Sequence, residues 1–565
     1  MIATSAGYKP EMPERWFRHG VIYCLDVDTY QDSNGDGIGD LPGLIDRLDH
    51  LARLGVTCIW LNPIHPSPDR DDGYDITDFY AVSSKIGSLG DFVELIHQAS
   101  NRGIRVIIDL VVNHTSNEHP WFQSARSDPD SPYRDWYVWS KDEPSALDQG
   151  MVFPGYQDTT WTFDDVAGAW YYHRFYDFQP DLNMSNPDVR QEIEKIIGFW
   201  LQLGVDGFRL DAAPFIIELT VPDDPNPRQD FSWLNDFRAQ LAWRRGDAVI
   251  LAEANVEASQ LTEYFGDGDR LPMLFNFILN QRLFLSLARE EAGPIIQALG
   301  ETPVIPHTCQ WATFLRNHDE VDLGRLVGHE HDEVFAAFGP DANMQLYGRG
   351  IRRRLAPMFG NDQRRLKMAY ALQFSLPGTP VIRYGDEIGM GENLRLPERN
   401  AIRTPMQWSS ERHAGFSTCR KKSDLRRPVI SGGEFGYESV NVELQQRDPQ
   451  SLLTWFQSAL LILRECPEFG AGTCSYTDTG HRSVLALLHD APSGAMLALT
   501  NLSGKSHTID VGPQELQSGE PIEVFADRDY PPIANDLNRI RVGPYGYRWI
   551  RLRRTIGGRA GSRDR

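Results

Sequence analysis

The sequence predicts an α/β protein built on a (β/α)8 TIM barrel, with a small subdomain inserted after strand 3 and an antiparallel β domain at the C-terminus. Four segments carry this prediction: DLVVNH (109–114), GFRLDAAP (207–214), ILAEAN (250–255) and FLRNHD (314–319). Each ends an apolar, β-branched run with polar residues, which is typical of a buried parallel strand and its C-terminal tip. In a (β/α)8 barrel these tips converge on the face that holds the active site.

Eight strand candidates precede residue 390, as a closed barrel requires. Amphipathic helical stretches separate most of them; in segment 41–56, for example, Leu44, Leu48 and Leu51 share one face. Strands that alternate with helices favour a parallel sheet with right-handed crossovers, and their number favours closure, although the count alone leaves an open sheet as an alternative. The candidates are GVIYCLDV (20–27), TCIWLNP (57–63), RVIIDLVV (105–112), DGFRLDA (206–212), AVILAEA (248–254), MLFNFIL (273–279), ATFLRN (312–317) and TPVIRYG (379–385).

Two long connections interrupt this alternation. About 70 residues rich in Trp, Tyr, Pro and Asp (115–190) follow the third strand, and this length predicts an inserted subdomain. A second insertion, at about 320–362, contains RRR (352–354). For this basic run we expect a solvated helix face, with a salt-bridging lid segment as the alternative.

After about residue 460, short strands alternate with Gly, Pro, Asn and Asp turns, a pattern typical of an antiparallel β domain. Examples are SVLALLHD (483–490), AMLALTNLSG (495–504) and YRWIRLRR (547–554). The predicted organisation is a catalytic barrel over 14–114 and 181–460, an inserted subdomain B over 115–180, a C-terminal β-sandwich over 461–555 and a disordered tail over 556–565.

The composition limits the classes of function. A net charge of −22 argues against nucleic acid and anionic membranes as partners, since phosphate groups attract clustered cations. The N-terminus lacks the apolar core of a signal peptide, and no run approaches the roughly 18 apolar residues of a membrane helix. Six cysteines without a CxxC pattern predict free thiols in a cytoplasmic protein. The oligomeric state stays open, a homo-oligomer included.

Three carboxylates end three of the predicted barrel strands: Asp211, Glu253 and Asp319. A retaining glycosidase needs such a pair, one group acting as acid and one as nucleophile. Arg209 shares side-chain parity with Asp211 and would keep it ionised, whereas apolar neighbours would raise the pKa of Glu253, as suits a general acid. Singly, each carboxylate has a structural alternative, namely a buried Arg–Asp bridge, a polar loop start or a helix N-cap. Their shared position at strand tips favours catalysis.

His114 and His318 also follow strand candidates. A lone histidine at such a place is more often a hydrogen-bonded structural residue. Beside carboxylates at converging strand tips, both imidazoles would instead donate to sugar hydroxyls.

The loop DSNGDGIGD (32–40) predicts a calcium site and no organic cofactor is expected. Its oxygen donors occupy positions 1, 3, 5, 7 and 9 of a calcium loop: Asp32, Asn34, Asp36, the Ile38 carbonyl and Asp40. Gly37 occupies the turn position, but Gly43 stands where a bidentate Glu is expected. The alternative is a polar loop of Asx turns, and magnesium is a weaker fit because the cage supplies several protein oxygens.

The four segments, together with QPDLN (179–183), resemble the characteristic regions of the α-amylase superfamily, glycoside hydrolase family 13. The resemblance extends to about residue 555, and the combination of motifs is highly specific. It implies that Asp211 is the nucleophile, Glu253 the acid/base and Asp319 a transition-state stabiliser that binds the 2- and 3-hydroxyls. It also implies a shared glucose subsite lined by Arg209, His114 and His318.

Two further motifs extend the resemblance. In DDGYDI (71–76), Tyr74 would stack on the glucose and Asp75 would bind its far hydroxyls. RTPMQW (403–408) resembles a segment of the exo-acting α-glucosidase and trehalose synthase branches, and its Arg403 would meet Asp75 at the bottom of a closed pocket. Such an Arg–Asp pair selects a terminal glucose because it blocks longer chains. Two more residues match the ligands of a second calcium site in the family: Asn113 and Asp181.

Among the branches, the chain is most similar to trehalose synthase, through segments such as DGYDITDFY, NHTSNEHPWFQ and QWATFLRNHDE. It departs from that branch at YCLDVDTY (23–30), where a YELHV-like run is usual, and at MVFPGYQDTTWTFDD (151–165). The resemblance implies interconversion of maltose and trehalose, both small α-glucosides, through a covalent glucosyl-enzyme. The alternatives are an α-glucosidase or transglucosylase that hydrolyses or transfers terminal α-glucose, and a non-catalytic amylase-like binding subunit, against which the intact triad argues.

Overall fold

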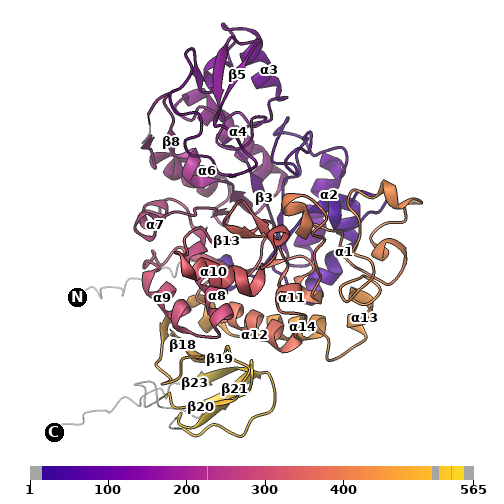
Figure 1. Cartoon of the computed structure of the whole chain (residues 1–565), viewed down its shortest axis with the longest axis vertical. Coiled ribbons are helices and arrows are strands. Elements are labelled where there is room, and N and C mark those ends of the chain that lie inside the picture. Colours follow the sequence, from indigo (N-terminus) through magenta and orange to yellow (C-terminus); the bar gives the residue numbers. More distant parts are fainter. Residues whose placement is uncertain (1–14, 225–226, 512–520, 536, 553–565) are drawn as a thin grey trace, which may run out of the picture.

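A closed barrel of eight parallel strands forms the centre of the molecule and confirms the predicted fold class (Figure 1). The computed structural model describes residues 15–224, 227–511, 521–535 and 537–552. Around the barrel the strands follow the order β1-β16-β12-β11-β10-β7-β3-β2. They are β1 (Ile22–Leu25), β2 (Cys58–Leu61), β3 (Arg105–Leu110), β7 (Gly207–Leu210), β10 (Val249–Ala252), β11 (Met273–Phe275), β12 (Gln310–Phe314) and β16 (Thr379–Arg383).

Each observed strand differs from its predicted range at one or both ends, and two of them show why. The candidate at 273–279 is a strand only to Phe275, because the Asn276 side chain then accepts a hydrogen bond from the amide of Leu279 and caps helix α8 (Phe277–Arg289). The candidate at 312–317 begins two residues earlier and ends at Phe314. The apolar residues that follow β11 misled the sequence pattern, since a short apolar run fits a strand and a buried helix equally well.

Helices connect the barrel strands and pack against their outer side. Helix α1 (Leu41–Leu54) shows how the local sequence sets its bounds. Asp40 accepts a hydrogen bond from the Gly43 amide at the start, and Gly55, with φ of 98°, ends the helix in the left-handed region that glycine favours. The other long helices of this layer are α2 (Leu89–Ser100), α4 (Pro187–Leu203), α6 (Ser232–Arg244), α8, α9 (Gly293–Glu301), α12 (Gln363–Phe374) and α14 (Leu452–Arg464).

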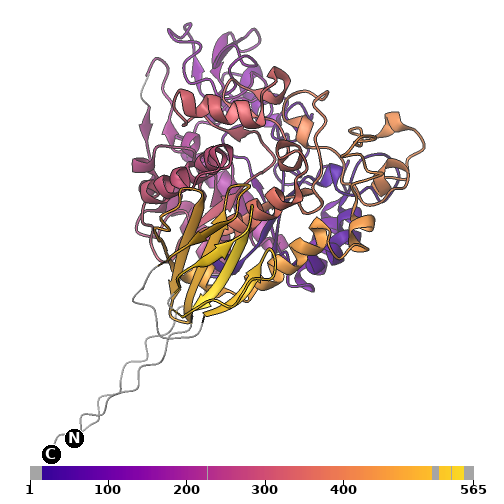
Figure 2. The ribbon, with the colours of Figure 1, turned by 60° about the horizontal axis from the view of Figure 1, so that its bottom comes forward.

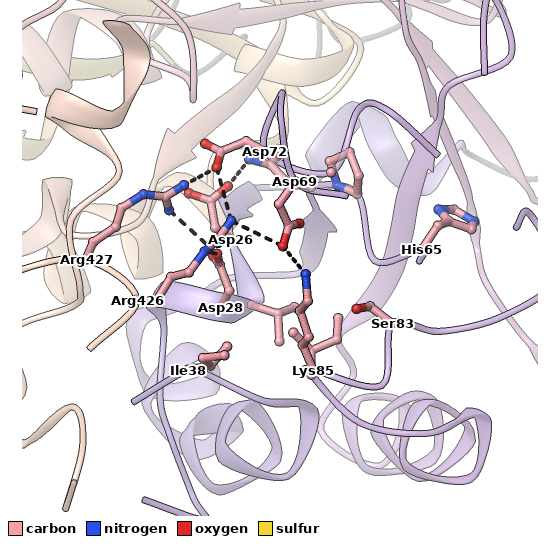
Figure 3. Close-up of a pocket in the computed structure, with 15 residues that line it drawn as sticks. Asp26, Asp28, Ile38, His65, Asp69, Asp72, Ser83, Lys85, Arg426 and Arg427 are labelled. Carbon is pink, nitrogen blue, oxygen red and sulfur yellow. Dashed lines mark hydrogen bonds and ion pairs between the residues drawn. The ribbon is translucent and has the colours of Figure 1, made fainter. Parts of the chain in front are cut away.

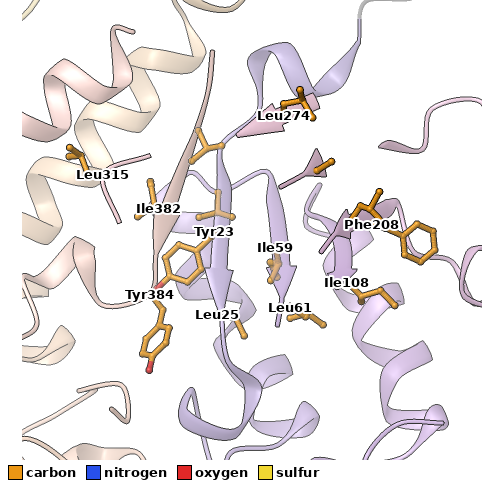
Figure 4. Packing of buried hydrophobic residues seen from close by; sticks show 14 of the residues in the cluster. Tyr23, Leu25, Ile59, Leu61, Ile108, Phe208, Leu274, Leu315, Ile382 and Tyr384 are labelled. Carbon is orange, nitrogen blue, oxygen red and sulfur yellow. The ribbon is translucent and has the colours of Figure 1, made fainter. Parts of the chain in front are cut away.

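Alternate residues of most barrel strands enter two different apolar cores. In β1, Ile22 and Cys24 join a cluster with Trp60 inside the barrel, whereas Tyr23 and Leu25 pack against the surrounding helices (Figure 4). All four residues of β1 are buried, which explains why the strands are continuous apolar runs. Charged side chains that the site needs are therefore concentrated at the strand ends.

Between β3 and α4 the chain forms a small unit of its own, at the top of Figure 1. It contains α3 (Pro120–Ser127) and a three-stranded antiparallel sheet with the order β4 (Trp139–Ser140), β6 (Ala169–Tyr172), β5 (Trp161–Asp164). Its aromatic residues pack largely on one another; Phe122, for example, contacts both Trp139 and Tyr171. A β-bridge between His114 and Asp181 ties the two ends of the insertion to the barrel.

The basic run 352–354 is not a solvated helix face, so that prediction is wrong. It lies between β15 (Gly350–Ile351) and α11 (Leu355–Met358). Arg354 is 2% exposed and donates to carbonyls of residues 384 and 402, while Arg352 donates to carbonyls of residues 394, 396 and 398. Arg353 pairs with Glu392. Guanidinium groups satisfy the carbonyls of an irregular segment that has no ladder of its own, and so fix residues 384–402 beside the site.

The C-terminal region forms two antiparallel sheets that share an apolar core, at the bottom of Figure 1 and in front in Figure 2. The larger sheet has the order β17 (Thr473–Tyr476), β18 (Val484–Ala491), β19 (Gly494–Asn501), β23 (Tyr547–Leu552), β21 (Pro521–Ala526), and the smaller pairs β20 (His507–Ile509) with β22 (Ile540–Val542). The predicted antiparallel β domain is confirmed. The predicted disordered tail, 556–565, lies outside the described residues.

All six cysteines are free thiols, as predicted. Over the ranges that the structure describes, none of the helices combines the length and apolarity needed to cross a bilayer.

Candidate active site

A cavity of about 390 Å³ lies at the C-terminal ends of the barrel strands. This volume falls within the range of about 300–1,000 Å³ that is usual for small-molecule sites. The barrel brings together residues from segments that follow β2, β3, β7, β10 and β12. Six residues predicted from the sequence line the cavity: Tyr74, His114, Asp211, Glu253, His318 and Asp319.

One arginine holds both Asp211 and Glu253. Each carboxylate directly follows its strand, β7 or β10, so its backbone is fixed by the barrel ladder. The Arg209 guanidinium is 1% exposed; its Nη1 lies 2.5 Å from Asp211 Oδ1, and its Nη2 pairs with Glu253. The predicted Arg209–Asp211 pair is therefore present. The next residue, Ala212, has φ of 49°, a strained conformation for a residue other than glycine and one that is often retained at ligand sites.

The surroundings of Glu253 favour its protonated form. Burial raises the pKa of Glu253 to about 8; Arg209 opposes this shift, and the carboxylates of Asp211 and Asp319 add to it. A carboxylic acid with this pKa holds its proton at neutral pH and can give it to a leaving group.

Asp319 lies in the opposite electrostatic environment. Its Oδ1 is 3.2 Å from Arg399 Nε and 3.0 Å from Arg403 Nη2, and its Oδ2 is 3.1 Å from His318 Nε2. Although burial raises the pKa of Asp319, the guanidinium groups of Arg399 and Arg403 hold it well below its usual range. Arg316 donates to the Asp319 carbonyl at 2.7 Å and fixes the turn after β12. The cavity thus holds an ionised carboxylate and a protonated one.

Tyr74 and two histidines form a hydrogen-bonded wall of the cavity. Tyr74 Oη donates to Asp109 Oδ2 at 2.9 Å and lies 2.7 Å from His318 Nε2, and the two rings stack at a centroid distance of 5.8 Å. His114 Nε2 is 3.0 Å from the Tyr74 carbonyl. Burial lowers the pKa of His318 far below its ordinary value and that of His114 to about 4, so both imidazoles are neutral hydrogen-bonding groups.

The predicted contact between Arg403 and Asp75 is wrong. Arg403 pairs with Asp72, with Nη1 to Oδ2 at 2.5 Å, and with Asp319. Asp75 does not line the cavity; it accepts hydrogen bonds from the Ser67 hydroxyl at 2.6 Å and from backbone amides of its own loop. The reason is the turn over residues 71–74, in which the Tyr74 amide donates to the Asp71 carbonyl at 2.9 Å and Asp72 has φ of 50°.

Three further residues that the sequence analysis did not single out line the cavity: Asp71, Phe153 and Arg399. Burial raises the pKa of Asp71 to about 7. Arg399 precedes Arg403 by four residues in RNAIRTPMQW and pairs with the same carboxylate, a spacing that could have pointed to it. No sequence signal distinguishes Phe153, which is 3% exposed, from the other aromatic residues of the insertion.

The loop 32–40 fits a cation only in part. Gly37 has φ of 95°, as the turn position requires. Asp32 Oδ1 accepts hydrogen bonds from the amides of Asn34 and Gly35 at 3.0 and 2.7 Å, and Asp40 Oδ1 caps α1. Within the described part of the chain, no three His, Cys, Asp or Glu side chains gather as metal ligands. The Asx turns of the alternative interpretation are present, and calcium stays a prediction.

Asn113 and Asp181, the residues matched to a second calcium site, do lie together. Their side chains are hydrogen-bonded, and Asp181 Oδ1 also accepts the Arg174 amide at 2.9 Å. Burial raises the pKa of Asp181 to about 7, with these hydrogen bonds opposing the shift. The pair is satisfied without an ion, so this site also stays a prediction.

Three carboxylates at the C-terminal face of a TIM barrel, one protonated and one ionised, define a glycoside-active enzyme. The model of the α-amylase catalytic domain matches residues 25–469, and the model of the maltogenic amylase C-terminal domain matches residues 475–549. The chain belongs to the α-amylase family, as the motifs indicate.

The chain is similar in sequence to trehalose synthases and similar in structure to an α-amylase. The chain is 42% identical over 545 residues to the trehalose synthase of Thermus thermophilus, a match that covers 96% of this chain and 56% of that protein, so it spans little more than half its length. It is 41% identical to the trehalose synthase/amylase of Mycolicibacterium smegmatis, covering 98% of this chain and 95% of that protein. The crystal structure of the α-amylase from H. orenii superposes with a TM-score of 0.76 at 28% identity, covering 95% of this chain and 100% of that one.

Proposed function

We propose that the enzyme interconverts maltose and trehalose through a covalent glucosyl-enzyme. The observation that carries this proposal is the 41% identity to a trehalose synthase/amylase over 95% of that protein's length. The geometry of the cavity supports it, because Asp211 and Glu253 share one arginine, and because Glu253 differs in protonation state from Asp319. The retaining mechanism is general in this family.

In this mechanism an Asp211 oxygen attacks C1 of the non-reducing glucose of maltose, while Glu253 gives its proton to the glycosidic oxygen and glucose is released. The released glucose turns within the cavity. Its 1-hydroxyl then attacks C1 of the glucosyl ester while the Glu253 carboxylate takes the hydroxyl proton. The ester bond to Asp211 breaks, which releases the Asp211 carboxylate, and trehalose forms. Asp319 would bind the 2- and 3-hydroxyls and stabilise the positive charge that develops at C1.

The bound glucose would contact the wall formed by Tyr74, His114 and His318, all three of which line the cavity. Asp71, rather than Asp75, supplies a further carboxylate at this end of the cavity. Two arginines were predicted for this subsite, Arg209 and Arg403. Neither lines the cavity, so each would act through the carboxylate that it pairs with rather than on the sugar.

A cluster of aromatic residues that reaches the cavity through Phe153, which we call the roof, supports an isomerase over a hydrolase. Tyr176 and Tyr347 donate to the same oxygen of Glu398 at 2.7 and 2.8 Å, and Phe153 packs on Tyr347 at a centroid distance of 4.8 Å. These residues come from three separate segments, which follow β3, β12 and β16. A roof that excludes water favours recapture of glucose by the ester over hydrolysis.

The test is a time course of purified enzyme with maltose, and separately with trehalose, in which all sugars are followed by NMR. We expect each disaccharide to form from the other with little free glucose. Glucose alone, or new oligosaccharides, would contradict the proposal and establish the α-glucosidase or transglucosylase alternative.

We also propose that the loop 32–40 binds calcium, supported by the spacing of its oxygen donors and by the left-handed Gly37. An ion that binds only the folded state raises the melting temperature with its concentration. Prolonged treatment with a chelator under mild denaturant should therefore lower the melting temperature, and Asp36→Ala should abolish this response. Metal analysis of the purified protein that finds less than about 0.1 calcium per chain would contradict the site.

We propose a cytoplasmic location, supported by the six free cysteines. Cell fractionation tests it, and recovery of the protein from the culture medium would contradict it.

A further inference from the structure

A second, smaller cavity of about 50 Å³ lies beside the active site, and seven of the 15 residues that line it are charged (Figure 3). The two cavities have no lining residue in common, but one loop separates them. In that loop Asp72 and Gly73 line the smaller cavity, whereas Asp71 and Tyr74 line the larger one. A displacement of Asp72 would therefore also displace its neighbours in this loop, which form part of the active-site wall.

A row of ion pairs connects the two cavities. Arg427 pairs with Asp72 Oδ1 and has its Nη1 3.6 Å from Asp28 Oδ2 (Figure 3). The other oxygen, Asp72 Oδ2, lies 2.5 Å from Arg403 Nη1, and Arg403 Nη2 lies 3.0 Å from Asp319 Oδ1. Each oxygen of Asp72 thus accepts from a different arginine, one facing the small cavity and one facing the catalytic carboxylate.

The central members of this row are buried and depend on one another. Arg403 is 3% and Arg427 6% exposed, and Arg427 Nη1 lies 3.4 Å from the Arg403 carbonyl. The two guanidinium groups pair with the same carboxylate and repel each other, and the Asp72 charge between them compensates for the repulsion. Although burial raises the pKa of Asp72, Arg427 and Arg403 hold it well below its usual range, so its charge is constant.

We propose that Asp72 and Arg427 are positioning residues, which orient Asp319 for catalysis by fixing Arg403. Neither residue lines the active-site cavity, so neither acts on the substrate directly. Without the Asp72 charge, Arg403 loses one of its two carboxylates and moves away from Arg427, and Asp319 loses the orientation that Arg403 gives it. This inference rests on the role proposed for Asp319.

The test compares Asp72→Asn, Arg427→Met, Arg427→Lys and the double variant Asp72→Asn/Arg427→Met. The rate of bond cleavage is measured with 4-nitrophenyl α-glucoside and with maltose. A displacement of about 1 Å in a catalytic group costs on the order of 100-fold, so we expect kcat to fall about 10- to 100-fold in Asp72→Asn and Arg427→Met. KM should change less than about threefold, because the lost interaction acts on the transition state.

Two further comparisons separate positioning from a general loss of structure. Arg427→Lys should recover part of the kcat, and the double variant should be no slower than Asp72→Asn, because Arg427 acts through Asp72. Lys85→Met is the matched control: Lys85 lines the same small cavity and pairs with Asp69, not with Asp72. Its kcat should stay within about twofold of the parent enzyme.

A kcat within about twofold of the parent in folded Asp72→Asn and Arg427→Met would overturn the proposal, and so would a rise in KM at unchanged kcat. If Asp72→Asn does not fold, the difference between Arg427→Lys and Arg427→Met decides. Cleavage of the aryl glucoside does not depend on whether water or a sugar later takes the glucosyl group from the enzyme. An enzyme that yields only glucose from maltose would therefore refute the proposed isomerase and leave this comparison valid.

Discussion

Glu253 and Asp319 occupy similar places in the fold but differ in charge. Both follow barrel strands and line the same cavity. Glu253 pairs with Arg209, which it shares with Asp109 and Asp211, and its pKa rises to about 8. Asp319 has two arginines beside it, and its pKa stays far below the ordinary value. Burial raises the pKa of both carboxyl groups, so the number of arginines beside each one decides which keeps its proton.

The largest effect on activity should come from a substitution of Asp211. This residue is neither the protonated acid nor the carboxylate beside two arginines, but it supplies the nucleophile. Asp211→Asn keeps the shape of the side chain and removes the charge that attacks C1. We expect kcat on maltose to fall by on the order of 10⁴-fold or more, as for other losses of a catalytic nucleophile. The melting temperature should change little, since the barrel core does not involve this side chain. A purified, folded variant with near-normal kcat would place the nucleophile elsewhere.

The raised pKa of Glu253 predicts the alkaline limb of the pH profile. The reaction needs the protonated acid in the free enzyme, so kcat/KM should fall as the pH rises through about 8. Glu253→Gln cannot give a proton, and we expect a loss of about 10²- to 10⁴-fold on maltose. The loss should be smaller on an α-glucosyl fluoride, whose leaving group needs no proton. An unchanged alkaline limb in the variant would assign that limb to another group.

The sequence predicted this site where a strand determines the geometry and failed where a loop does. Strand parity was enough to pair Arg209 with Asp211, and the strand ends placed all three carboxylates in one cavity. The partner of Arg403 was mispredicted, because the left-handed turn at Asp72 is a tertiary feature of an irregular segment. The basic run 352–354 was mispredicted for the same reason, since its guanidinium groups bind carbonyls remote in sequence.

Removing a cation from Asp319 should make it resemble Glu253. Arg399 is the foremost of the groups that hold the pKa of Asp319 down, so Arg399→Met should raise that pKa toward its ordinary value. The acid limb of kcat/KM should then move to higher pH, and kcat at neutral pH should fall about tenfold. Arg395→Met is the control, because Arg395 lies in the same segment but is exposed. An unmoved acid limb would show that Arg403 and His318 suffice.

A substitution of Glu398 should have the smallest effect on activity. This carboxylate accepts hydrogen bonds from two tyrosine hydroxyls and takes no part in bond cleavage. Glu398→Gln keeps one acceptor oxygen and loses its charge, so the roof should loosen while the packing of Phe153 on Tyr347 persists. We expect cleavage of maltose to stay within about twofold, and the share of glucose among the products to rise about two- to threefold, because water reaches the ester more often. Product ratios from NMR measure this, with the exposed Glu411→Gln as control. An unchanged ratio would mean that aromatic packing alone excludes water from the ester, and that the carboxylates matter only beside the reacting bond.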